Sequence, residues 1–389
     1  MSDHIKIHTH LFLVSDDLIP NITPALDPRF RPCSVCLLCS PDTTEQTGRL
    51  EFLLKQSGVA VSLWNIQDGW DIAHIRERVL EFVTGHTNEE LVLNVSGGTR
   101  PMSLAAYEVF RTLEKPVYYV HPTRDHVVWL HPRERESFDL ADRIKLPAFL
   151  TAHGMRLVSS RKEGIPEQLR TLTATLVKEV GRFARPLSIL NWLAAASEAR
   201  LVSPKLDTDL LQDSVMQELL RLFSSNGLLK VDSSYRLRFA DEQSRFYTNG
   251  GWLEEHLFSE LYNLRAGIPI IQDLARNVLI EWDAHKSPVK NELDVVFLAN
   301  NRLYIIECKT RKFDASGNPD SDAASVLYKL DTLRDYLGGT EAQAMLVTYR
   351  TIPEIQKRRA EEFGVRVCEG FDLRNLSRIL ERWIGGKSL

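Results

Sequence analysis

Two acidic residues and a lysine in the last third of the chain are spaced in a way that suits hydrolysis of a phosphate ester. Asp294 precedes the apolar run 295–298, Glu307 follows the apolar run 303–306, and Lys309 comes two residues later. Short apolar runs of this kind predict buried β-strands. Residues two apart on a strand point to the same face, so Glu307 and Lys309 are expected on one side of the sheet.

Two adjacent asparagines, Asn300 and Asn301, predict a tight hairpin turn between these runs. The hairpin brings Asp294, at the start of the first strand, near Glu307, at the end of the second. Two neighbouring carboxylates suit a hard divalent cation such as Mg²⁺, which takes oxygen ligands and keeps several waters. A metal that activates water, with a lysine beside it, is what cutting a phosphodiester requires. The alternative is a surface hairpin with solvated charges, which the strongly apolar second strand disfavours.

The pattern D-x12-E-C-K resembles the motif of the PD-(D/E)-x-K nuclease superfamily. The resemblance implies that Asp294, Glu307 and the backbone carbonyl of Cys308 bind Mg²⁺ or Mn²⁺, and that Lys309 assists catalysis. No Pro-Asp precedes the motif, because the acid stands in the tripeptide 292–294, Glu-Leu-Asp. This variant is tolerated in the superfamily.

Further residues resemble other parts of that family. Members commonly supply one more acid from a helix before the core sheet, and Glu254 matches that position best, with Glu255 as the alternative. Either acid is equally well explained as an ordinary carboxylate at a helix start. The expected helix 326–337 resembles the one after the catalytic lysine, which implies that Tyr328 and Lys329 contact the nucleic-acid backbone.

A second candidate site lies in the first third of the chain, at the junction 94–102, N-V-S-G-G-T-R-P-M. It follows an expected strand and runs into an expected helix, the place where ligands bind in open α/β sheets. Gly97 and Gly98 allow close approach of the backbone, Arg100 offers a guanidinium, and the helix begins near Pro101. These features suit a phosphate group. A plain strand-to-helix turn is an equally good interpretation.

The stretch N-V-S-G-G-T-R-P-M-S-L-A-A-Y resembles the signature of CARF domains, the sensors of cyclic oligoadenylates in type III CRISPR defence. The loop 15–21 corresponds to the other ligand-contacting segment of that family. The resemblance implies a homodimer that binds one cyclic oligoadenylate, most simply cyclic tetra-adenylate, across its two-fold axis. The implied ligand-binding residues are Ser15, Asp16, Asn21, Asn94, Ser96, Gly97, Gly98, Thr99, Arg100 and Met102.

The order of elements predicts three units in an α/β chain. Residues 1–150 alternate strands (11–14, 35–39, 59–64, 91–95, 117–120) with helices, which indicates a doubly wound, Rossmann-like CARF domain. Residues 151–244 contain helices at 187–195 and 210–223 and a two-stranded wing, and form a winged-helix-like connector. Its acidic second helix favours a structural role over DNA reading. Residues 245–389 form a restriction-endonuclease-like α/β domain.

Composition excludes several classes of protein. The 389 residues are 43% hydrophobic and 26% charged, with a net charge of −4, so any basic patch must be local. The sequence shows neither an apolar run of membrane-span length nor a secretory signal, which predicts a cytoplasmic protein without membrane contact. Five cysteines argue against a disulfide framework, and Cys33, Cys36 and Cys39 are expected in core packing rather than on a metal.

Together these features predict a metal-dependent endonuclease of type III CRISPR defence that acts on DNA, RNA or both, with single strands favoured. Cyclic tetra-adenylate bound across the dimer is the expected activator. Two alternatives remain: a ligand-responsive winged-helix transcription regulator, and a repair or restriction nuclease without an activator.

Overall fold

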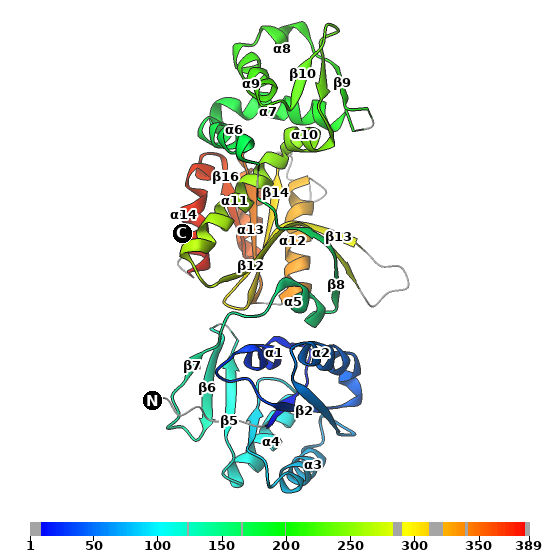
Figure 1. Cartoon of the computed structure of the whole chain (residues 1–389), viewed down its shortest axis with the longest axis vertical. Helices are drawn as coiled ribbons and strands as arrows, with labels where there is room; N and C mark the ends of the chain where they lie inside the picture. The colour runs from blue at the N-terminus through cyan, green and yellow to red at the C-terminus, as the bar shows by residue number, and fades with distance from the viewer. Residues whose placement is uncertain are drawn as a thin grey trace.

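The computed structural model describes residues 9–122, 124–164, 166–198, 200–282, 290–310, 322–338 and 341–385. Three sheets are stacked along the long axis of the molecule, with the N-terminal unit at one end, the connector at the other and the C-terminal unit between them (Figure 1). No helix among the described residues is long and apolar enough to cross a membrane.

The N-terminal unit is a seven-stranded sheet of order β3-β2-β1-β4-β5-β6-β7. The first five strands are parallel and β6 and β7 are antiparallel, so the predicted doubly wound fold is confirmed. Its elements are β1 (Thr9–Leu13), α1 (Ile19–Leu26), β2 (Ser34–Cys39), η1 (Pro41–Thr43), α2 (Thr44–Gln56), β3 (Ala60–Asn65), α3 (Ile72–Gly85), β4 (Leu91–Asn94), α4 (Arg100–Thr112), β5 (Val117–His121), β6 (His126–His131), β7 (Phe138–Asp139) and α5 (Leu146–Ala152).

The C-terminal unit is a six-stranded sheet of order β16-β15-β14-β13-β12-β8. Its edge strand β8 (Met155–Arg161) pairs with β12, although the sequence placed these residues in the connector. The other elements are η2 (Tyr247–Gly251), α11 (Trp252–Gly267), β12 (Ile271–Trp282), β13 (Lys290–Ala299), β14 (Arg302–Lys309), α12 (Asp322–Gly338), β15 (Gln343–Thr348), α13 (Glu354–Glu362), β16 (Val365–Glu369), η4 (Gly370–Asn375) and α14 (Leu376–Ile384).

The connector consists of helices and a three-stranded sheet of order β10-β11-β9. Asp213 caps α9 and divides the single helix expected at 210–223 in two, because its carboxylate accepts hydrogen bonds from the amides of Val215 and Met216. The elements are α6 (Glu167–Lys178), α7 (Val180–Ala195), β9 (Val202–Lys205), α8 (Thr208–Gln212), α9 (Ser214–Ser225), β10 (Leu229–Val231), β11 (Arg236–Phe239) and α10 (Glu242–Phe246).

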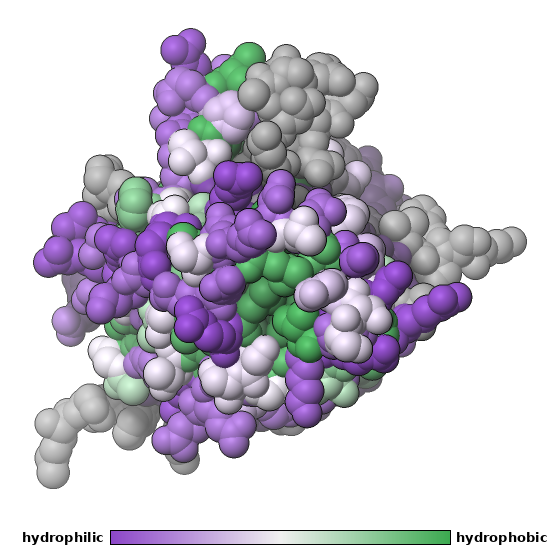
Figure 2. Space-filling model, turned by 90° about the horizontal axis from the view of Figure 1, so that it is seen from above, coloured by the Kyte–Doolittle hydropathy of each residue, from purple (hydrophilic) through white to green (hydrophobic). Residues whose placement is uncertain are grey.

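The outer end of the connector carries both hydrophobic and hydrophilic side chains. Seen from that end, a hydrophobic area lies at the centre of the view and hydrophilic side chains surround it (Figure 2). On α9, Glu218 accepts hydrogen bonds from both terminal nitrogens of Arg182, at 2.9 and 2.5 Å. Arg221, Lys230 and Arg236 are exposed, so the structural role of the connector stays a prediction.

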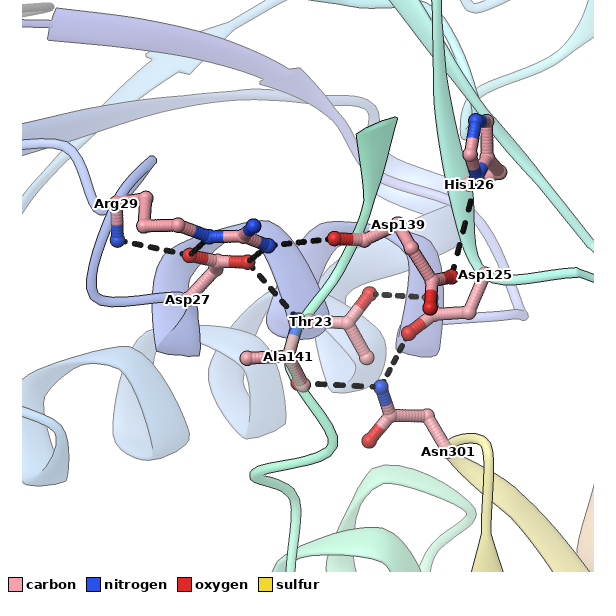
Figure 3. Close-up of polar contacts among 8 residues, drawn as sticks. All are labelled: Thr23, Asp27, Arg29, Asp125, His126, Asp139, Ala141 and Asn301. Carbon is pink, nitrogen blue, oxygen red and sulfur yellow. Dashed lines mark hydrogen bonds and ion pairs between the residues drawn. The ribbon is translucent and has the colours of Figure 1, made fainter. Parts of the chain in front are cut away.

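The N-terminal and C-terminal units are joined by a buried polar network at the tip of the β13–β14 hairpin (Figure 3). Asn301, which is 3% exposed, donates a hydrogen bond to the carboxylate of Asp125 in the N-terminal unit. Thr23 of α1 donates to the same carboxylate at 3.1 Å. On the other side, Gln272 of β12 makes two bonds to Asn301. Its Nε2 donates to Asn301 Oδ1 at 2.5 Å, and its Oε1 accepts from the backbone N–H of Asn301 at 2.9 Å. A polar group buried this deeply stabilises the joint only while its partners stay in place.

Candidate functional site

The predicted hairpin is present. Asn300 and Asn301 have φ values of +50° and +52°, the left-handed conformation that a two-residue turn of this type requires. Val295 pairs with Ile306, which places Asp294 beside Glu307 at the next position. One detail of the prediction was wrong: β13 begins at Lys290, because pairing with β12 extends it beyond the hairpin.

Asp294 lies between two further acids, and its environment disfavours a negative charge. Burial raises the pKa of Asp294 well above its usual value, and the nearby carboxylates of Glu307 and Glu254 raise it further. One of its oxygens accepts a hydrogen bond of 2.7 Å from the amide of Cys308, which opposes this shift. A buried cluster of acids with raised pKa values is typical of a functional site.

Of the two acids at the start of α11, Glu254 is the one that faces this cluster. Burial, followed by the charges of Glu292 and Glu307, raises the pKa of Glu254 to about 7. Glu255 points elsewhere, to an internal ion pair with Arg276 at 3.2 Å, in which the two side chains are 2% and 5% exposed. The structure therefore favours Glu254 as the third acid.

Lys329 of α12 contacts the carboxylate cluster directly. Its ammonium nitrogen is 3.0 Å from both oxygens of Glu307 and 2.9 Å from the carbonyl oxygen of Glu292. Lys329, expected at the nucleic-acid backbone, thus bonds to a motif carboxylate here. Lys309 is half-buried at the end of β14, where it pairs with Thr348 of β15.

Asn277, which none of the sequence motifs indicates, lies at the same site. Its amide donates a 3.0 Å hydrogen bond to Glu254. Asn277 has φ +48° within β12, where the pairing with β13 passes from Arg276 directly to Val278. The sequence signal for this kink is a lone asparagine inside a strand, because asparagine adopts a positive φ more readily than most residues do.

The side chains at this site fit a divalent cation in chemistry but do not form a ready cage. Carboxylate oxygens are the ligands that Mg²⁺ and Mn²⁺ prefer. Among the residues that the structure describes, no three acidic, histidine or cysteine side chains are arranged to hold a metal ion. Glu254, Asp294 and Glu307 each accept a hydrogen bond from a protein donor, and a cation would have to replace some of these contacts.

The two segments of the second candidate site meet at the carboxyl ends of adjacent parallel strands, since β1 pairs with β4. A Cβ atom on Gly97 would lie 2.2 Å from the carbonyl oxygen of Leu13, so only glycine fits there. Gly98 has φ +76°, where glycine is also favoured. Arg100 and Asp16 are exposed and Ser15 is half-buried.

Several of the predicted ligand-binding side chains have internal partners. Asn94 is fully buried and donates to the carbonyl of Pro20 and to Asn21 Oδ1, at 2.8 and 3.0 Å. Ser96 donates to Asn94 Oδ1 at 2.6 Å. Thr99 caps α4, and Met102 lies in the core. These side chains shape the loop. Ser15 and Asp16 also have internal partners, the carbonyl of Asp17 at 3.2 Å and Gln46 at 2.6 Å, and contact of any of these residues with a ligand stays a prediction.

Comparison with known proteins identifies the two domains. Residues 9–149 match the family model of the Card1 CARF domain, and residues 240–386 match that of the Card1-like endonuclease domain. The predicted N-terminal CARF and C-terminal endonuclease folds are thereby confirmed. No curated protein matches the chain.

Solved structures similar to this chain include protein VC1899 from Vibrio cholerae, with 29% identity, a TM-score of 0.88 and coverage of 97% of this chain and 98% of that one. Can2 from Sulfobacillus thermosulfidooxidans, in complex with cyclic tetra-adenylate, has 28% identity and a TM-score of 0.81, with coverage of 97% and 99%. A type III CRISPR defence DNA nuclease activated by cyclic oligoadenylate shares the fold, at 16% identity, TM-score 0.53 and coverage of 88% and 45%.

Proposed function

Because the chain belongs to the Card1-type family, which joins a CARF domain to an endonuclease domain, we propose that it is a metal-dependent endonuclease of type III CRISPR defence. Cyclic tetra-adenylate bound across a homodimer is its activator. The observation that carries the proposal is the grouping of Glu254, Asp294 and Glu307 beside Lys329, in a chain whose other end carries the CARF loop.

In the proposed reaction Asp294, Glu307 and the carbonyl of Cys308 would hold Mg²⁺ or Mn²⁺, which would supply an activated water and polarise the phosphate. Lys309, on the same strand as Glu307, orients the attacking water or stabilises the charge that develops on the phosphate. Glu254 lies close enough to influence the pKa of Asp294 and is placed to reach the metal through water. Single-stranded DNA or RNA is the proposed substrate.

The interior of the protein supplies a physical connection between the two sites. Asn94, beside the glycine loop, bonds to Asn21 of α1 at 3.0 Å. Two residues later on the same helix, Thr23 bonds to Asp125, which also accepts from Asn301 in the turn of the catalytic hairpin. A shift of α1 on ligand binding would therefore act on the strands that carry Asp294 and Glu307. Binding can favour the active arrangement only by its difference in affinity for the two states.

The cavity beside α1 is part of the same connection. It has a volume of about 550 Å³ and lies between the two domains, with Asp16 on the CARF side and Asn300 and Arg302 of the hairpin on the other. Asp16 is also one of the predicted ligand-binding residues. A ligand that pulls on the loop 15–21 would thus move one wall of this cavity.

The deciding experiment measures cleavage of labelled single- and double-stranded DNA and RNA by the purified chain. Mg²⁺ or Mn²⁺ and cyclic tetra-adenylate are each added or left out, and the larger and smaller cyclic oligoadenylates are included. Cleavage that needs both metal and cyclic tetra-adenylate is expected. Equal cutting without any cyclic oligoadenylate would indicate a repair or restriction nuclease, and sequence-specific duplex binding without cutting would indicate a transcription regulator.

A further inference from the structure

A groove with aromatic walls runs along α12 away from the catalytic carboxylates. It has a volume of about 480 Å³, and its lining includes Trp282, Tyr328, Lys329, Thr332, Leu333 and Tyr336. The six α12 residues of the lining, Ser325 among them, recur at the three- and four-residue intervals that place side chains on one face of a helix. The opposite wall comes from the end of β12, which carries Trp282.

The aromatic side chains of this groove are unusually accessible. Tyr336 is 54% exposed and Tyr328 is 45% exposed, whereas Leu333, on the same helix face, is 5% exposed and belongs to the core. The rings of Trp282 and Tyr336 meet edge to face, with their centroids 4.7 Å apart at 86°. This contact fixes Tyr336 on one side and leaves much of its ring open to solvent. An exposed, positioned aromatic ring suits stacking with another flat ring.

The groove lies next to the acidic cluster. Within the described residues, Lys329 is the only charged side chain that lines the groove. Its ammonium forms an ion pair with Glu307 at 3.0 Å, so Lys329 lies between the groove and the acidic cluster. From Lys329 to Tyr336 the helix rises by about 10 Å, the length of about three stacked nucleotides.

We propose that this groove is a subsite for unpaired nucleotides of the substrate strand. Bases next to the cleaved bond stack on Tyr336 and Trp282, and Lys329 meets a phosphate at the entrance. A stacking surface accepts any base but requires that the base be free of a duplex. The groove would thus give the preference for single strands a structural cause. This inference rests on the proposed nuclease function and names the part of the substrate that the site selects.

The test compares binding and cleavage by the full-length wild type, Trp282→Ala, Tyr336→Ala and Tyr336→Phe in the presence of cyclic tetra-adenylate. Binding of a fluorescent single-stranded oligonucleotide is measured by anisotropy in EDTA, which prevents cutting. Each alanine variant should raise the dissociation constant about 5- to 150-fold, the loss expected for one base stack. Tyr336→Phe should bind like the wild type, because stacking needs the ring and not the hydroxyl.

Tyr262→Ala is the matched control, since Tyr262 is 56% exposed on α11 and does not line the groove. Thermal unfolding and binding of cyclic tetra-adenylate establish that each variant folds. In cleavage assays the alanine variants should show a raised KM for single strands, with kcat within about threefold of the wild type. An oligonucleotide with abasic positions should bind the wild type and the alanine variants equally weakly.

Unchanged affinity in both alanine variants would overturn the subsite and leave the nuclease proposal intact. A loss of equal size on a blunt duplex, or a fall in kcat at constant KM, would also overturn it, because either result points to a structural role for the Trp282–Tyr336 contact. Wild-type protein that neither binds nor cuts any nucleic acid would contradict both proposals.

Discussion

Glu307 and Lys309 occupy alternate positions, on the same face, at the end of one strand, and each is proposed to contribute to the reaction. We expect Glu307→Ala and Lys309→Ala to lower the rate of activated cleavage by more than about 100-fold. Both variants should bind cyclic tetra-adenylate with unchanged affinity, because the CARF loop lies in another domain. Quenched-flow or gel assays measure the cleavage rate, and calorimetry measures ligand binding. Lys230→Ala, at an exposed lysine of the connector, is the control. Undiminished cleavage by the Glu307 variant would refute the assignment.

Glu254 is predicted to make the metal-free protein less stable as the pH rises. Its pKa is about 7 in the folded protein and near 4.5 in the unfolded chain, so the folded state holds the proton more tightly. The stability that this group contributes, roughly 1–3 kcal/mol, is therefore present below about pH 4.5 and is lost as the pH rises toward 7.

The measurement is thermal unfolding in EDTA between pH 5 and 8, for the wild type and for Glu254→Gln. The glutamine variant should show a smaller loss of stability over this range, and saturating Mg²⁺ or Mn²⁺ should remove much of the loss in the wild type. Identical pH dependence in the two proteins would show that the charge of Glu254 costs nothing in the fold.

At the scale of elements, β12 places Asn277 against Glu254 by means of a local left-handed kink. The hydrogen bond from Asn277 lowers the pKa of Glu254, and its removal should raise that pKa. We predict that Asn277→Gly, which keeps the backbone conformation, shifts the acidic limb of the pH profile of cleavage upward by about half a pH unit to one unit. An unshifted profile would mean that Asn277 does not act through Glu254.

The hairpin and β12 show which elements could be predicted from the sequence. The hairpin was predictable because its apolar runs and Asn-Asn turn are local signals. In β12 the apolar pattern that would predict a strand is hidden, because it is interrupted by buried polar residues such as Asp273, Arg276 and Glu281. They are tolerated because each meets a partner from a distant segment, as Asp273 does with Lys162 at 2.6 Å. Such partners cannot be identified from a local window.

Similar reasons explain the other differences between sequence and structure. The loop expected at 15–21 is shorter in the structure, because helix α1 begins at Ile19 with Pro20 in its first turn, where proline is accepted. Strand β8 is short and half-exposed, and its place at the edge of the C-terminal sheet depends on long-range pairing. At the catalytic site the motif acids were predictable, whereas Asn277 depends on β12 and was missed.

At the scale of the whole molecule, Asn301 is the clearest place to separate sensing from cutting. Asn301→Gly keeps the left-handed turn and the backbone N–H bond to Gln272, but it removes the side-chain bonds to Asp125 and Gln272. We expect cyclic tetra-adenylate to bind with an affinity within about threefold of the wild type, while the increase in cleavage that it produces falls by about 5- to 150-fold, the usual range of a coupling energy.

Asn300→Gly is the matched control, because it changes the other left-handed position of the same turn. Cleavage rates with and without activator, together with direct ligand binding, give the activation factor of each variant. If Asn301→Gly and Asn300→Gly activate like the wild type, the coupling passes through another part of the domain interface, such as the hydrophobic cluster shared by α1, α2 and the C-terminal sheet.

The contact of Lys329 with Glu307 has a consequence for the loading of the enzyme. A cation that approaches this carboxylate must compete with an ammonium group tethered to the same chain, and tethered groups act at effective concentrations in the millimolar range. Lys329→Met should therefore bind Mn²⁺ more tightly than the wild type when no activator is present, as titration calorimetry can measure. Equal affinities would show that no such competition exists. Competition of this kind would keep the metal site largely empty until Lys329 moves, even in a solution rich in the metal.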